Sequence, residues 1–254
     1  MTDIITTPSG LSGRIRGLKV REERILADRK LARSGSQVDE LLKACWLETL
    51  EVGPYGFPIE SPVNWDKVLV GDRFFALLKI RVLTYGPDYA FSLTCERPAC
   101  RANIDWELSL NDLPVRLLSL PLKDAFLAGN RLETRLPEAG CKVWFKLMTG
   151  ADERRLSQQR KGANDKVLSG LVAARVVEVE GVEERKRRAF LEDLSMGDAN
   201  HLLETFDEHD CGVETGLDVE CQDCGAQMRV ELPFDRSFLM PASRRKRTPQ
   251  PEPT

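Results

Sequence analysis

Histidine is scarce in this chain of 254 residues, which contains only His201 and His209. No serine lies in a G-x-S-x-G turn, so a Ser/His/Asp hydrolase has little to be built from. The sequence also lacks the G-x-x-x-x-G-K-S/T phosphate cradle and a G-x-G-x-x-G turn after a strand; residues 160–166, RKGANDK, only place a glycine beside a lysine. We therefore expect neither hydrolase chemistry nor nucleotide binding.

Long apolar runs are absent as well. No stretch approaches the roughly 18 apolar residues that a membrane span needs, and the N-terminal sequence MTDIITTPSG has no basic region followed by an apolar run. We expect a soluble protein without a membrane span and without Sec-type export. Seven cysteines make an odd number, so free thiols and metal binding fit the chain better than a disulfide framework, in a reducing compartment.

The charge is nearly balanced, with 37 Lys and Arg against 40 Asp and Glu, and the net charge is -3. This balance lacks the electrostatic footprint of a nucleic-acid binder. The basic runs at 185–188 and 244–247 are interpreted as a solvated helix face and a solubilising tail, with phosphate contact as the weaker alternative. The acidic pairs Glu22/Glu23 and Glu183/Glu184 lie in charged helical stretches, which favours a solvated face over a general acid and base.

The hydrophobic pattern predicts an α+β fold. Capping signals and apolar spacing predict an extended segment at 10–20 and helices at 20–33, 36–50, 68–85, 149–161 and 165–174, with further helices on either side of residue 195. Alternation predicts strands at 89–93, 104–108, 132–136, 142–147, 175–179, 216–220 and 228–232. The helix over 68–85 is the most apolar of these and is expected at the centre of the core.

Four cysteines carry the clearest chemical signal. Cys95 and Cys100 lie in FSLTCERPACRANIDWEL, Cys221 and Cys224 lie in LDVECQDCGAQMRVEL, and both stretches read as strand, knuckle and strand. Two such hairpins can present four thiolates to one Zn²⁺, and a complete tetrahedral set leaves no open position for water or substrate. The sequence therefore predicts a structural zinc site that joins two hairpins far apart in the chain.

Other interpretations of the cysteines stay open. The four thiols can be unrelated buried side chains, the hairpins can form without a permanent metal, or the C-x-x-C can be redox-active, although its βαβ context is missing. Cys45 and Cys141 lie on apolar faces and are interpreted as core residues. Cys211 and His209, in HDCG, are alternative fourth ligands.

The long gap between the knuckles requires an insertion. We expect residues 9–110 plus 211–240 to form a zinc-knuckle core with N-terminal helices, and residues 111–210 to form an inserted subdomain of helices and a β-hairpin. Residues 1–8 and the basic, Pro-rich residues 241–254 are expected to be disordered tails.

The order of these segments resembles the baseplate hub protein family of T4-like contractile-tailed phages, which also occurs in phage-tail-like contractile injection systems. The resemblance spans about residues 9–240. It rests on SGLSGRIRGLKVREE, VGDRFFALLKIRVLTYG, the first knuckle hairpin, LMTGADE, FLEDLSMGD and CGVETGLDVECQDCGAQMRVELPFDRSF.

The resemblance implies a non-enzymatic baseplate component that acts in hub assembly as a structural part or an assembly factor. Its implied partners are hub, spike, wedge or tape-measure proteins, with no small-molecule substrate and with self-association left open. It would reside in the bacterial cytoplasm during assembly and then in the tail baseplate. We expect the charged segment 9–35 to contact neighbouring subunits, because its few apolar anchors would stabilise it poorly in isolation.

The rival interpretation is a zinc-ribbon module that binds nucleic acid. It would use the hairpins as a platform and the basic runs as phosphate contacts. The hairpins, however, carry carboxylates that would repel a phosphate backbone, and nucleic acid is therefore not the expected partner. These carboxylates belong to Glu96, Asp105, Glu107, Glu220, Asp223 and Glu231.

Overall fold

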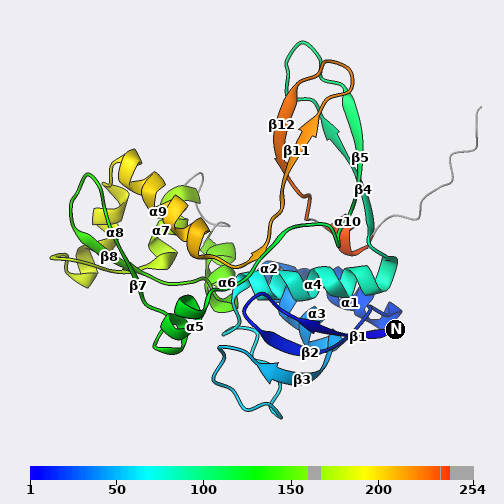
Figure 1. Ribbon diagram of the computed structural model, residues 1–254, viewed down its shortest axis with the longest axis horizontal. Helices are drawn as coiled ribbons and strands as arrows, with labels where there is room; N and C mark the ends of the chain where they lie inside the picture. The colour runs from blue at the N-terminus through cyan, green and yellow to red at the C-terminus, as the bar shows by residue number, and fades with distance from the viewer. Residues whose placement is uncertain (160–166, 235, 241–254) are drawn as a thin grey trace, which may run out of the picture. The chain divides into compact units, whose positions relative to one another are not determined.

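The chain forms a mixed α and β structure with two compact units (Figure 1). This computed structural model describes residues 1–159, 167–234 and 236–240. The larger unit consists of Met1–Tyr89 and Glu107–Glu214, and the smaller one of Ala90–Trp106 with the described part of Thr215–Thr254. The predicted α+β character is confirmed. The expected tail at 241–254 and the basic run at 244–247 lie outside the described residues.

A three-stranded antiparallel sheet opens the larger unit, in the order β1 (Thr2–Thr6), β2 (Leu11–Arg16) and β3 (Trp46–Val52). The central strand β2 is almost entirely buried. Residues 1–8 were expected to be disordered, and this expectation is wrong for 2–6, because they pair with β2 along their whole length and Ile5 enters the core. The short polar segment has no strand signal of its own, and it becomes a strand by pairing with β2, which follows it directly in the chain.

Helices connect β2 to β3: the 3-10 turn η1 (Val20–Glu22), α1 (Glu23–Ala27), α2 (Arg29–Ser34) and α3 (Gln37–Cys45). The single helix predicted at 20–33 is broken at Asp28, whose carboxylate accepts hydrogen bonds from the first amides of α2. The helix predicted to reach Leu50 ends at Cys45. Residues 46–52 have apolar spacing that also suits a strand, and pairing with β2 decides between the two.

The predicted central helix is α4 (Val70–Tyr85), which ends before Gly86 as expected. Half of its residues are buried, and it packs against α3 and β2. Three of the buried side chains are charged, namely Asp72, Arg73 and Arg81. Asp72 accepts hydrogen bonds from the Ser9 amide (3.0 Å) and the Tyr55 hydroxyl (2.8 Å), while Arg73 pairs with Asp39 of α3. Burial raises the pKa of Asp72, and the hydrogen-bond donors around the carboxylate oppose that shift only in part.

The rest of the larger unit lies between β6 (Val115–Arg116) and β10 (Gly212–Val213), which pair with each other. The sheet β7-β8-β9 and helices α7 to α9 enclose an apolar core that includes Phe145 and Phe206. The predicted hairpin at 132–147 is confirmed, whereas α5, β6 and β10 had no sequence prediction. The elements are α5 (Leu120–Leu127), β7 (Leu132–Arg135), β8 (Lys142–Phe145), α6 (Gly150–Gln159), α7 (Val167–Arg175), β9 (Val176–Val179), α8 (Glu184–Glu192) and α9 (Met196–His209).

The structure divides the chain differently from the expected core of 9–110 plus 211–240 and insertion of 111–210. Ion pairs join the insertion to the N-terminal part, because Glu153 of α6 pairs with Arg73 (3.1 Å) and Arg154 pairs with Asp39 (3.2 Å). The hairpins, by contrast, have an apolar cluster of their own. The hairpins therefore form the separate unit. In the described ranges, no helix combines the length and the apolar character needed to cross a bilayer.

Substitution Gly71→Ala should destabilise the larger unit. Gly71 of α4 lies against the backbone of residues 211–212, and an added Cβ would overlap the Cys211 carbonyl oxygen. Because backbone on both sides resists movement, we expect a loss of about 2 kcal/mol or more in the free energy of unfolding. Urea unfolding followed by circular dichroism measures it.

The matched control is Gly170→Ala in α7, where nothing lies within 4 Å of the added Cβ. This change should be neutral or should stabilise by up to about 1 kcal/mol, through the higher helix propensity of alanine. Equal effects of the two substitutions would contradict the close crossing at Gly71.

Candidate metal centre

Two β-hairpins build the smaller unit. The first pairs β4 (Asp88–Thr94) with β5 (Asn103–Ser109), and the second pairs β11 (Gly216–Glu220) with β12 (Gln227–Glu231), followed by α10 (Arg236–Leu239). The predicted strands on both sides of each cysteine pair are confirmed. Their alternation places one row of side chains inward and leaves the other row in solvent.

The first knuckle is a backbone loop closed by hydrogen bonds. The Cys95 amide donates to the Ala102 carbonyl oxygen (2.8 Å), and the Cys100 amide donates to the Arg97 carbonyl oxygen (2.9 Å). Arg101, directly after the second cysteine, has a φ of 52° in the left-handed region. The loop thus turns both cysteine side chains to the same side at the cost of one strained residue.

The second knuckle repeats this geometry with a better-suited residue. The Cys221 amide donates to the Ala226 carbonyl oxygen (2.9 Å), and the Gly225 amide donates to the Cys221 carbonyl oxygen (2.8 Å). Gly225 follows the second cysteine, as Arg101 does in the first knuckle, and has a φ of 66°. Glycine adopts this conformation without steric cost.

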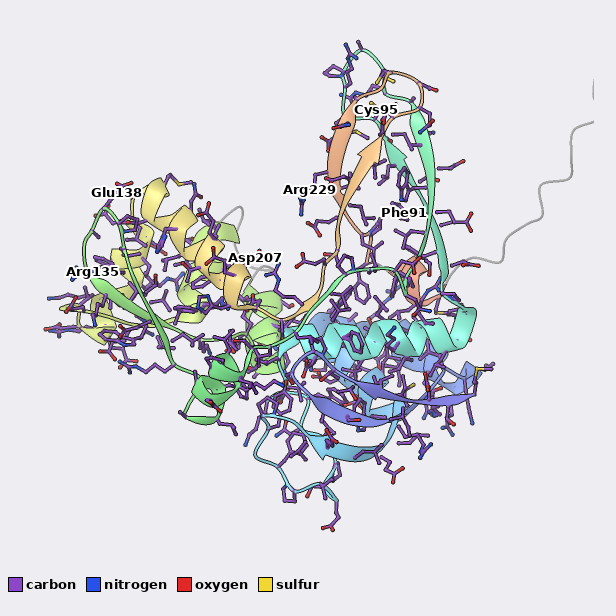
Figure 2. The ribbon with its side chains drawn as sticks, in the orientation of Figure 1. Phe91, Cys95, Arg135, Glu138, Asp207 and Arg229 are labelled. Carbon is purple, nitrogen blue, oxygen red and sulfur yellow. The ribbon has the colours of Figure 1, made fainter. Side chains whose placement is uncertain are left out.

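The four cysteine sulfurs converge at the hairpin tips (Figure 2, where Cys95 is labelled). All lie within 4.8 Å of one another, and all four residues are free thiols. Across the hairpins, the Sγ atoms of Cys95 and Cys224 are 3.7 Å apart, and those of Cys100 and Cys221 are 3.8 Å apart. Four sulfurs at the zinc–thiolate bond length define a tetrahedron with edges of about 3.8 Å. The donor set therefore fits a tetrahedral metal ion.

The cysteine thiols lie so close together that their pKa values differ from one another. The Ala226 amide favours the Cys224 thiolate and holds its pKa near 7, below the usual value, even though burial opposes ionisation. For Cys95, the Arg97 amide also favours the thiolate, but burial and the neighbouring thiols outweigh it and raise the pKa to about 12. One negative charge thus makes the next harder to form. A bound cation is the ordinary means by which such a cluster becomes fully ionised.

A small apolar cluster lies beneath the cysteines. Ile104 of the first hairpin and Val219 and Met228 of the second are its buried members besides Cys95 and Cys221. The Glu96 amide also lies 3.2 Å from the Met228 sulfur, which joins the first knuckle to the second hairpin. So few buried side chains supply little free energy for a separate unit, and small units of this kind usually need a metal or a disulfide as well.

The alternative ligands are not part of this cluster. His209, at the end of α9, has its Nδ1 2.7 Å from the Thr205 carbonyl oxygen and its ring edge against Phe145. Burial, the larger cause, and nearby carboxylates raise the pKa of the Cys211 thiol, so it stays protonated. Cys45 is fully buried and Cys141 packs against the core of the insertion, in agreement with their interpretation as core residues.

The basic run of α8 is largely neutralised. Arg185 pairs with Glu183 (2.7 Å), Arg188 pairs with Glu192 (3.2 Å), and Arg187 donates to the Val177 carbonyl oxygen. These contacts support the prediction of a solvated helix face.

Sequence patterns gave no sign of one groove in the larger unit. A cavity of about 550 Å³ is lined by residues of β3, among them Trp46 and Leu47, and by residues of the segment that follows, among them Ile59 and Trp65. The ring of Trp46 meets that of Trp65 edge to face, with centroids 5.3 Å apart. The sequence predicts a helix over 46–50, which would separate Trp46 from its neighbours in the sheet, so the pattern gives no indication of this groove.

A family model described as "T4 bacteriophage base plate protein" matches residues 1–240. The chain belongs to this T4 base plate family. The match includes both knuckle hairpins and the whole larger unit, so the two hairpins and the insertion between them belong to one family architecture. Searches of curated proteins and of solved structures each found no match. Membership supports a location in the tail baseplate of a virion and contacts with other baseplate proteins.

The left-handed residues of the two knuckles should respond in opposite ways to substitution. Gly225→Ala adds a Cβ to a residue with positive φ and should destabilise this base plate protein by about 1 kcal/mol, although its neighbours leave room. Arg101→Gly removes the same strain and should be neutral or stabilising. Chemical unfolding of both variants measures the difference. A large loss for Arg101→Gly together with none for Gly225→Ala would contradict the geometry of the knuckles.

Proposed function

We propose that the protein is a non-enzymatic component of a contractile phage tail or a phage-tail-like injection system, and that it acts in assembly of the baseplate hub as a structural part or an assembly factor. The observation that carries the proposal is the family match over residues 1–240, which leaves out only the last 14 residues. The hub is favoured within the baseplate by the order of segments in the sequence. Baseplate structural proteins work through their surfaces, and their partners are other baseplate chains.

We further propose that Cys95, Cys100, Cys221 and Cys224 hold a structural Zn²⁺. The sulfur separations of 3.7 and 3.8 Å support this proposal, as does the small apolar cluster beneath them. Zinc bound by four thiolates has no open coordination position, so it contributes to folding and not to hydrolysis or Lewis-acid catalysis. In this role it fixes the two hairpins as one unit that a partner can recognise.

Candidate partners are hub, spike, wedge or tape-measure proteins. The segment expected to reach them was 9–35, but residues 11–16 form the central strand of a buried sheet. Deleting the whole segment would therefore unfold the larger unit and would test nothing about partners. Most of the exposed residues lie in 20–34, where Glu22 and Leu26 are buried but α2 has no buried residue.

The alternative function, a zinc-ribbon module for nucleic acid, is disfavoured by charge. The acidic residues noted on the hairpins are all exposed, so they face any ligand that approaches the knuckles. A phosphate backbone would be repelled there.

Cysteine replacement in the cluster tests the zinc proposal. In the unmodified protein, a strong zinc chelator should lower the melting temperature, because binding free energy of a structural metal is folding free energy. Cys224→Ser should lower the melting temperature without chelator and abolish the further effect of chelator.

The matched control is Cys141→Ser, which replaces a partly buried thiol in the insertion. It should keep the full response to chelator. An unmodified protein that melts at the same temperature with and without chelator would refute the structural zinc, while leaving the baseplate role untouched.

Gene deletion in the organism that encodes the chain tests the baseplate role. Loss of the protein should abolish complete contractile particles and leave tubes, sheaths or partial baseplates, and the intact gene supplied in trans should restore them. Electron microscopy of fractionated lysates measures the outcome. Normal particles at normal yield after deletion would rule out a required part in hub assembly.

A further inference from the structure

The outer face of α5 is apolar and has no partner in the described structure. Leu120 and Leu127 are 74% and 61% exposed, and they lie seven residues apart, on the same side of the helix. Pro121 and Ala128 are exposed beside them, and Leu117, just before the helix, is 71% exposed. Exposed leucines are common singly, but a row of them along two helical turns is typical of an interaction site.

The exposed leucines belong to a helix that is firmly attached to the larger unit. Its inner face packs Phe126 edge to face against Tyr55, with ring centroids 5.5 Å apart, and the Tyr55 hydroxyl donates to buried Asp72. The chain before the helix is held by the Leu118 amide, which donates to the Pro8 carbonyl oxygen (3.0 Å).

The chain after α5 is held in the same way. Asn130 exchanges two hydrogen bonds of 2.9 Å with the backbone of Leu147. The helix is thus fixed at both ends and along one face. The exposed leucines therefore belong to a firmly held helix, which lies below β7 in Figure 1.

A single charge interrupts the apolar row. Asp124 lies between Leu120 and Leu127, and it is exposed. Within the part of the chain that the structure describes, its carboxylate has neither an ion pair nor a side-chain hydrogen bond. The spacing of three and four residues from Leu120 to Asp124 to Leu127 is that of a helix–helix seam, where one polar side chain selects the partner and the register.

We propose that the outer face of α5 docks an amphipathic helix of a different baseplate protein, which presents a lysine or arginine to Asp124 between apolar side chains that cover Leu120 and Leu127. Charge complementarity selects this occupant. In a symmetric pair with a second copy, two Asp124 carboxylates would approach each other in a desolvated seam, where like charges are costly. The inference rests on the proposed baseplate role, and it adds the surface and the chemistry of the partner.

Photo-crosslinking from this face tests the inference in the full-length protein. p-Benzoylphenylalanine replaces Leu127, and in a second variant it replaces Met196, an exposed residue of α9, as the control. Particles and assembly intermediates are irradiated, and the attached peptide is sequenced by mass spectrometry. We expect the Leu127 variant to attach to another polypeptide, at an apolar helical segment that contains lysine or arginine. The Met196 variant should not attach to this segment.

Charge reversal supplies the second readout. Asp124→Lys, combined with the crosslinker at Leu127, should lower the yield of the adduct about tenfold or more, because a buried like-charge contact replaces an ion pair. Asp124→Glu should retain the adduct. In the Asp124→Lys variant, replacement of the partner's basic residue by an acidic one should restore the yield of the adduct. The melting temperature of each variant, expected to be unchanged, separates lost docking from lost folding.

An adduct with a second copy of the chain, an adduct at a segment without a basic residue, an unchanged yield in Asp124→Lys, or no adduct at all would each overturn the inference. These results remain distinct from failure of the baseplate role. If particle formation requires the protein but α5 gives no adduct, only the docking surface is refuted. If particles form without the protein, both the baseplate role and the docking surface are refuted.

Discussion

The convergence of four thiols at the tips of two hairpins is the constraint on which the smaller unit depends. Cys100 and Cys221 are 121 residues apart in the sequence. The insertion between them must therefore begin and end at points that lie close together. Short pairing between β6 and β10 brings the two ends of that insertion together within the larger unit. The closing of a long loop costs conformational entropy, and a metal bound by both hairpins would offset part of that cost.

The larger unit relies on a different kind of constraint, a set of ion pairs around the buried Arg73 and Asp39. Arg73 lies between Asp39 of α3 and Glu153 of α6, so one side chain joins the N-terminal part to the insertion. Removal of one member would leave an uncompensated buried charge, which destabilises a protein more than the intact pair stabilises it. Such networks specify one arrangement of helices.

Sequence reasoning succeeded where a signal is local. The strands beside each cysteine pair have clear alternation, α4 is long and apolar, and Ser195 accepts a hydrogen bond from the Asp198 amide (3.1 Å) as its capping pattern predicts. The cysteine spacing also indicated correctly which thiols come together. The strands, the helix and the cap are each specified by a few neighbouring residues, whereas the cysteines are recognised because the same short knuckle pattern occurs twice.

The failures share the opposite character. β1 and β3 are strands only because β2 lies between them, and the spacing of Trp46 and Leu50 suits a helix equally well until that pairing is known. The helix α5 has apolar residues on most sides, so its pattern gives no buried face to recognise. The ion pairs that bind α6 to α4 and α3 connect residues 80 and 115 positions apart. No local pattern predicts such pairs, so the sequence did not reveal which segments belong to which unit.

X-ray absorption spectroscopy at the zinc edge distinguishes zinc held by four thiolates from any other state of the cysteine cluster. We expect full-length protein purified without added metal to contain about one zinc per chain, bound by four sulfurs at about 2.3 Å with no nitrogen or oxygen ligand. A folded protein that contains no metal, or a zinc ion with fewer than four sulfur ligands, would contradict this expectation.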